Sequence, residues 1–250
     1  MVLNWRILIV SIVIFLIGCS SSIHYSEGKD KAVDNYIRLA QGYIQEGYID
    51  KALKPLNRAL VITPRSSKVY GMLALVYQLE GEDKQAEISF KKALSYDSDA
   101  SDVQNNYGAF LFYLKRFDEA YRSFSNAAHN LSYEKRSRAF ENMGIVAQKQ
   151  GREDKAKEHF KKALRLDGNL AIASLELSSI LQDQGEYSLA WSHYLVFVKQ
   201  SNQSSRSLLL GIQLARENDD RSAAASYALQ LKRMHPESKE YLEYRSQTRE

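Results

Sequence analysis

The amino-acid sequence repeats itself every 34 residues from Val33 onward, and this period restricts the fold more than any other feature. Three small residues recur at fixed offsets in each copy, which allows two facing helices to approach closely. The first four copies place them at Ala40, Ala52 and Ala59; at Ala74, Ala86 and Ala93; at Gly108, Ala120 and Ala127; and, after two inserted residues, at Gly144, Ala156 and Ala163. A fifth copy (Ser178, Ala190, Phe197) and a sixth (Ile212, Ala224, Leu231) are weaker. Such a period is typical of stacked helical units.

Large residues occupy the places between the small ones at helical spacing, as at Tyr36, Leu39 and Tyr43. Glycines fall midway through most copies, where a turn needs a residue with positive φ: Gly47, Gly81, Gly151 and Gly185, with Lys115 in the third copy. The chain has only three prolines, one of which, Pro55, falls inside an expected helix and predicts a kink there. These features favour an ordered, all-α chain.

The pattern resembles the tetratricopeptide repeat, a helix–turn–helix unit of 34 residues. The resemblance implies an all-α, right-handed superhelix of about six repeats, each an antiparallel helix pair. The expected repeats are 33–66, 67–100, 101–134, 137–170, 171–204 and 205–237. Residues 238–250 are expected to form a C-terminal capping helix or tail.

The N-terminal residues 1–18 resemble a bacterial lipoprotein signal peptide. Arg6 precedes an apolar run over residues 7–17 that is too short to span a membrane comfortably. Gly18 then precedes Cys19, the only cysteine in the chain. The resemblance implies that Cys19 is acylated, and residues 19–32 are expected to form a lipidated, flexible linker. The alternative is a short anchor helix with an incidental cysteine.

Ser20 follows Cys19, where an aspartate retains lipoproteins of this kind at the inner membrane. The resemblance therefore implies an outer-membrane, lipid-anchored protein that faces the periplasm. Several acyl chains anchor a protein far more firmly than one.

The sequence offers no sign of catalytic chemistry. Its histidines (24, 129, 159, 193 and 235) form no metal-binding motif, and nucleotide-binding and hydrolase motifs are missing from the sequence. The formal charge of +4 comes without basic runs, which argues against nucleic-acid binding. We expect no catalytic residue, cofactor, metal or small-molecule substrate, and therefore no enzyme.

The remaining candidate for function is the concave groove, which the first helix of each pair lines in arrays of this kind. The groove residues that we expect to bind a partner are Ile37, Ile44, Leu75, Leu79, Asn105, Phe112, Tyr113, Ile145 and Leu175. Some repeat proteins hold a C-terminal carboxylate here with basic and amide side chains, but Gly71 and Leu75 occupy two of those positions. The apolar early groove suits a helix or strand with hydrophobic anchors.

Three short runs resemble a narrower family, the pilotins of type IV pili (PilF/PilW). They are NNYGAFL (105–111), RFDEA (116–120) and SYALQL (226–231). The resemblance implies an outer-membrane lipoprotein that binds subunits of the pilus secretin and promotes their localisation and assembly, a step on which twitching motility depends. The alternative is a repeat-containing scaffold lipoprotein for another envelope machine, in β-barrel assembly or in recruitment of peptidoglycan enzymes.

Overall fold

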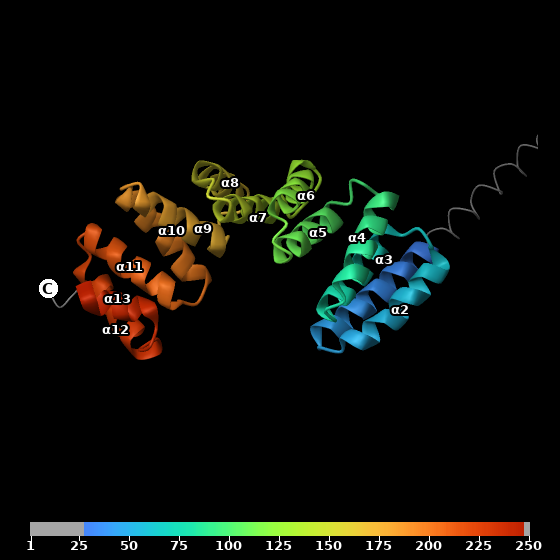
Figure 1. Cartoon of the computed structure of the whole chain (residues 1–250), viewed down its shortest axis with the longest axis horizontal. Helices are drawn as coiled ribbons and strands as arrows, with labels where there is room; N and C mark the ends of the chain where they lie inside the picture. Colours follow the sequence, from blue (N-terminus) through green and yellow to red (C-terminus); the bar gives the residue numbers. More distant parts are fainter. Residues whose placement is uncertain (1–27, 248–250) are drawn as a thin grey trace, which may run out of the picture. The chain divides into compact units, whose positions relative to one another are not determined.

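The computed structural model describes residues 28–247, and regular secondary structure in this range is entirely helical. Residues 28–45 form the first helix, and the others follow in antiparallel pairs (Figure 1). Their bounds are α2 (Ile49–Ile62), α3 (Ser67–Leu79), α4 (Asp83–Tyr96), α5 (Ser101–Tyr113), α6 (Phe117–His129), α7 (Arg136–Lys149), α8 (Glu153–Leu166), α9 (Ala171–Asp183), α10 (Tyr187–Gln200), α11 (Ser205–Glu217), α12 (Arg221–Met234) and α13 (Lys239–Gln247). The predicted all-α fold of helix pairs is confirmed.

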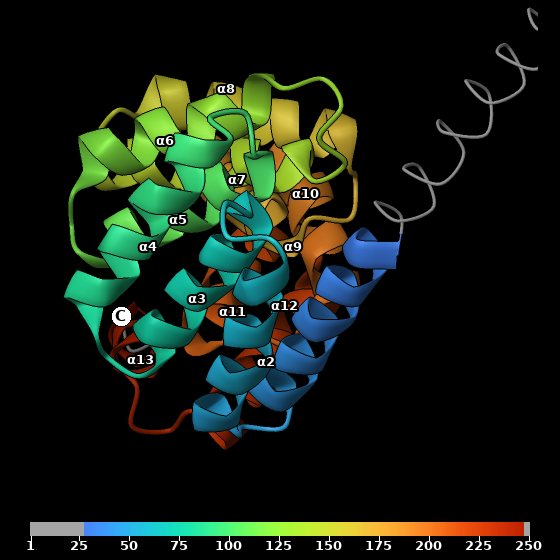
Figure 2. The ribbon, with the colours of Figure 1, turned by 90° about the vertical axis from the view of Figure 1, so that its right-hand side faces the viewer.

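The described residues form two compact units, 28–107 and 108–247, which divide within α5. In the first unit, helix 28–45 lies beside α2 (Figure 2), and α2 packs on α3. In the second unit, α7 packs on α8, α9 on α10 and α11 on α12. Each unit has its own buried apolar residues, and each is therefore described by itself.

The small residues of the period make room for aromatic rings. A Cβ atom added at Gly144 would lie 2.5 Å from Phe160 Cε1, and one added at Gly108 would lie 2.7 Å from Phe124 Cδ1. Phe160 is fully buried and Phe124 almost so. The alternation of a small residue on one helix with a ring on its partner therefore fixes the close packing of each pair.

The turns within the pairs have the expected backbone conformation. Gly47, Gly81, Gly151 and Gly185 have φ between 68° and 81°. Lys115 and Asp219 adopt the same left-handed region, with φ of 60° and 58°, in the two turns where the sequence lacks glycine. A side chain in this region costs about 1–2 kcal/mol relative to glycine, so the third turn is formed under strain.

Residues 28–32 correct one prediction, because they are helical although we expected them in the linker. Residues 28–31 are exposed, and the apolar packing of this helix begins at Val33. An exposed first turn shows no apolar periodicity, which is why the sequence pattern missed it. Pro55 lies inside α2, which continues from Ile49 to Ile62 without interruption.

The last helix, α13, covers the end of the second unit. Tyr241 and Tyr244 pack against a buried cluster formed by Leu208, Leu209, Ile212 and Leu231 of α11 and α12. No residue of α13 is itself buried, so one face of the helix shields the cluster while the other faces solvent. This is the arrangement that a capping helix requires.

Candidate partner-binding groove

A hollow of about 400 Å³ opens in the first unit between helix 28–45 and α3. Its wall combines four apolar side chains with three amides: Ile44, Met72, Leu75 and Leu79, with Gln41, Gln45 and Gln78. These residues fall three or four positions apart on two helices, so each helix presents one stripe to the hollow. No charged side chain lines it. The hollow therefore favours an uncharged segment with apolar side chains.

Three of the predicted groove residues meet in this hollow. Leu79 is 56% exposed, and Ile44 and Leu75 are half-buried. Leu75 and Leu79 are four residues apart on α3, and Ile44 faces them from helix 28–45. The sequence thus identified most of the apolar wall.

The prediction for Ile37 is wrong, because this side chain is 9% exposed and belongs to the apolar core of the first unit. It packs with Val33, Ala40 and Leu56. Ile37 lies one helical turn before Gln41, and its cluster also includes Val69 of α3. A partner cannot reach a side chain in that position.

The other predicted groove residues do not line the hollow. Asn105 is half-buried in the first unit. In the second unit, the Phe112 ring contacts that of Phe117 at 5.4 Å between centroids, while Tyr113 is 64% exposed. Ile145 and Leu175 are half-buried on α7 and α9. Their part in binding stays a prediction.

Among the apolar residues of the wall, sequence reasoning missed Met72. Met72 precedes Leu75 by three residues and Leu79 by seven, so it extends the same stripe on α3. Gln41 donates its amide N–H toward Met72 Sδ at 4.0 Å, which links the two helices across the hollow. The i, i+3, i+7 spacing was the signal that could have identified Met72.

The structure also explains why a carboxylate clamp cannot form at Gly71. A Cβ atom added there would lie 2.9 Å from Val103 Cγ2 on α5. Val103 is buried, so the space that a basic side chain would need is already filled.

In the second unit, the first helices of successive pairs are joined by polar side chains. Arg206 of α11 donates two hydrogen bonds to the Glu176 carboxylate of α9, at 2.5 and 2.9 Å, and Gln148 of α7 donates a third at 2.9 Å. Burial alone would raise the pKa of Glu176, but the hydrogen bonds from Arg206 and Gln148 hold that pKa below its usual value. These contacts connect three helix pairs.

Glu141 of α7 has a different role, because it acts as a cap for α9. Its carboxylate accepts a hydrogen bond from the Ala173 backbone N–H at 2.9 Å, in the first turn of α9. The residue before that helix, Leu170, has no side chain that could do so. Glu141 is only 5% exposed, and its burial raises the pKa of the carboxyl group.

His159 of α8 packs against the rings of Tyr121 and Phe140. His159 Nε2 lies 2.8 Å from the Tyr121 hydroxyl, and burial lowers the pKa of His159. No group of three or more potential metal ligands occurs among residues 28–247. Cys19, the predicted lipidation site, lies outside the described residues. Within that range, no helix combines the length and apolar character needed to cross a membrane.

Comparison with known proteins supports the repeat architecture and narrows the family. The tetratricopeptide-repeat family matches residues 67–99 and 99–169. A type IV pilus assembly protein of Pseudomonas aeruginosa, PilF, is 42% identical over 245 residues, which cover 96% of this chain and 97% of the relative.

Solved structures agree with this relationship. A PilF structure from Pseudomonas aeruginosa matches with a TM-score of 0.85 at 44% identity, over 88% of this chain and all of the other. The crystal structure of PilW, a widely conserved type IV pilus biogenesis factor, matches with a TM-score of 0.70 at 27% identity, over 85% and 97% of the two chains. The chain therefore belongs to the PilF/PilW family of tetratricopeptide-repeat proteins of type IV pilus biogenesis.

Proposed function

We propose that this protein is an outer-membrane lipoprotein, anchored through Cys19 and facing the periplasm, that acts as a pilotin. It binds subunits of the type IV pilus secretin and promotes their localisation and assembly into the outer-membrane ring. The observation that carries this proposal is the uncharged apolar hollow formed by Ile44, Met72, Leu75 and Leu79 in a protein of this family.

The hollow supplies the driving force for binding. Each 100 Å² of apolar surface that is buried on binding contributes about 2.5 kcal/mol before ordering costs. The amides of Gln41, Gln45 and Gln78 border the apolar wall and can satisfy backbone groups of a bound segment. A charged residue in that segment would lose its hydration without gaining a partner, so the hollow selects against it.

The lipid anchor contributes by confining the protein to the membrane where the ring forms. Confinement raises the effective concentration of the groove near secretin subunits, so a contact of micromolar affinity suffices. The proposed role requires no catalysis, cofactor or small-molecule substrate, because the protein acts only by binding.

The direct test is to replace Leu75 and Leu79 by glutamate and to measure binding of the purified full-length protein to the periplasmic part of the secretin. Each charge would enter an uncharged wall, so we expect binding to fall at least tenfold while helical content stays constant. The matched control is Leu131→Glu, at a position in the second unit that is 80% exposed. Undiminished binding by a folded Leu75→Glu/Leu79→Glu variant would remove the hollow from the proposed mechanism.

A functional readout separates the pilotin role from the alternative scaffold role. Secretin subunits should co-purify with the wild-type protein from cells, and piliation and twitching motility should decrease in the variant. Co-purification of β-barrel assembly or peptidoglycan enzymes in place of secretin would favour the alternative.

A further inference from the structure

The first repeat has a second hollow, of about 350 Å³, between helix 28–45 and α2. Its lining combines aromatic, aliphatic and basic side chains: Tyr36, Leu39, Tyr43, Lys51, Lys54 and Arg58. We name this surface the N-terminal face. The two helices lie side by side (Figures 1 and 2), and each contributes one stripe with a spacing of three or four residues.

The N-terminal face is the surface that a preceding repeat would cover. Leu73, one period after Leu39, is only 5% exposed because the second repeat stacks on the first. Leu39 is 47% exposed. The first repeat therefore presents an apolar stripe that no helix of the described part of the chain covers.

The charges on this face are uncompensated. None of the residues that line it is acidic. Lys54 and Arg58 form no ion pair with any acidic side chain in residues 28–247, and Lys51 lies over the Tyr48 ring at 3.9 Å. On α2, Val61 extends the stripe of Lys54 and Arg58 and is 83% exposed. Exposed valine and leucine with half-buried tyrosines beside unpaired cations is the composition of a surface that rests at a membrane interface.

The proposed lipid anchor at Cys19 also points to a membrane as the partner of the N-terminal face. Only residues 20–27 separate Cys19 from the helix that carries Tyr36 and Leu39. Eight extended residues reach at most about 28 Å, so an anchored Cys19 keeps the start of this helix within about that distance of the bilayer. We propose that the N-terminal face lies on the membrane surface and binds anionic phospholipid headgroups through Lys51, Lys54 and Arg58, with Leu39 and Val61 at the interface. This inference rests on the proposed anchoring through Cys19, but not on secretin binding.

The test uses the full-length protein, purified in detergent and reconstituted with vesicles of phosphatidylcholine alone or with 30% phosphatidylglycerol. Val61→Cys receives an environment-sensitive fluorophore, and Leu131→Cys is the matched control because both side chains are at least 80% exposed. We expect a several-fold rise in emission at position 61 on anionic vesicles and little change at position 131. Equal emission at position 61 on both kinds of vesicle would overturn the proposal.

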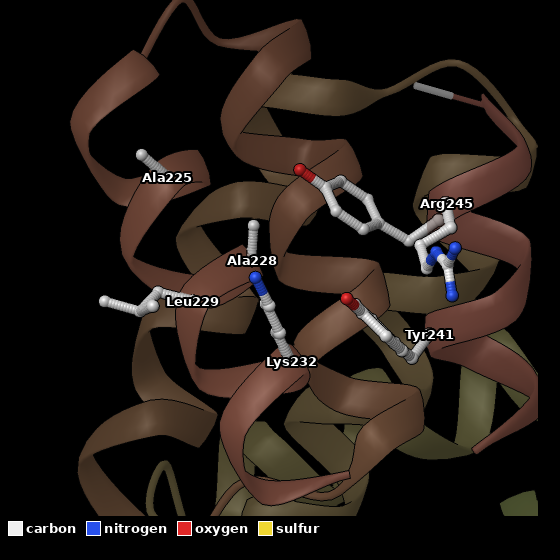
Figure 3. Close-up of a pocket in the computed structure, with 7 residues that line it drawn as sticks. Ala225, Ala228, Leu229, Lys232, Tyr241 and Arg245 are labelled. Atoms are coloured by element: carbon white, nitrogen blue, oxygen red, sulfur yellow. The ribbon is translucent and has the colours of Figure 1, made fainter. Parts of the chain in front are cut away.

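Charge reversal shows whether the basic residues carry the contact. Each Lys or Arg near an anionic surface contributes a factor of about five, so Lys54→Glu/Arg58→Glu should weaken the contact by about 25-fold or more. The control is Lys232→Glu/Arg245→Glu at the hollow between α12 and α13, which has a similar mixture of basic, tyrosine and leucine side chains (Figure 3). An equal loss in both variants would indicate nonspecific charge attraction and would contradict the proposal.

Vesicle flotation separates failure of the anchor from failure of the face. Flotation with neutral vesicles reports the anchor. If the protein floats only with anionic vesicles, the face is supported and the anchor is wrong; if it floats with neither, both are wrong. If it floats with both but the emission at position 61 does not change, the anchor stands and the face does not bind lipid.

Discussion

Replacing Gly144 by alanine should destabilise the protein although alanine is the better helix former. In the middle of a helix, alanine is favoured over glycine by about 0.8–1 kcal/mol. The added Cβ would lie 2.5–2.9 Å from three atoms of the Phe160 ring, which is fully buried. Overpacking of this kind costs about 1–3 kcal/mol. The cost of the clash outweighs the helix preference over most of this range, and we expect a net loss of up to about 2 kcal/mol.

Gly42→Ala is the matched control, because nothing lies within 4 Å of a Cβ added at Gly42. Only the helix preference remains at that position, so the free energy of unfolding should increase by up to about 1 kcal/mol. The same substitution thus has opposite signs at two helical glycines of one chain.

Chemical denaturation of both variants, followed by far-ultraviolet circular dichroism, measures these changes. Adding Phe160→Leu to Gly144→Ala should recover part of the loss, since the two residues are in contact and their effects are not additive. A Gly144→Ala variant more stable than the wild type would refute the argument that ring packing determines the small residues of the period.

Three further predictions concern polar and turn residues. Lys115→Gly should stabilise the second unit by about 1 kcal/mol in thermal unfolding, because it removes a side chain from the left-handed region. Arg206→Ala should cost about 1 kcal/mol at pH 7. The pKa of Glu176 is lowered in the folded protein, so this loss is complete above the unfolded pKa and should vanish as the pH falls through the folded pKa, which a denaturation series over pH can detect. The pKa of Glu141 is raised in the folded protein, so its effect on the free energy of unfolding has the opposite pH dependence. The charged Glu141 carboxylate destabilises the folded state above the folded pKa, and this penalty disappears below the unfolded pKa. The stability of Glu141→Gln relative to the wild type should therefore decrease as the pH falls.

The helix pairs could be predicted from the sequence because each packing contact imposes a residue type at a fixed offset. Gly144 needs its small size for Phe160, and Gly47 needs its positive φ. Both requirements recur every 34 residues and appear directly in the sequence. The strained turn at Lys115 follows the same period even though the preferred residue is missing.

The binding surface could be predicted only in part, because position within a repeat does not decide exposure. Ile37 and Ile44 are both apolar and seven residues apart, yet the first is in the core and the second lines the hollow. Capping of α9 by Glu141 depends on a contact 32 residues away in sequence, which no local pattern predicts. The N-terminal face was missed for another reason: its residues follow the repeat pattern, and only the lack of a covering helix makes them unusual.

We propose above that this member of a type IV pilus family promotes secretin assembly through its groove. The most direct measurement is to delete the gene and to examine whether the secretin still forms its detergent-resistant ring on a gel. We expect that the ring is lost, that the wild-type gene restores it, and that the gene for the Leu75→Glu/Leu79→Glu variant does not. An intact, correctly localised ring with normal piliation in the deletion strain would contradict this proposal.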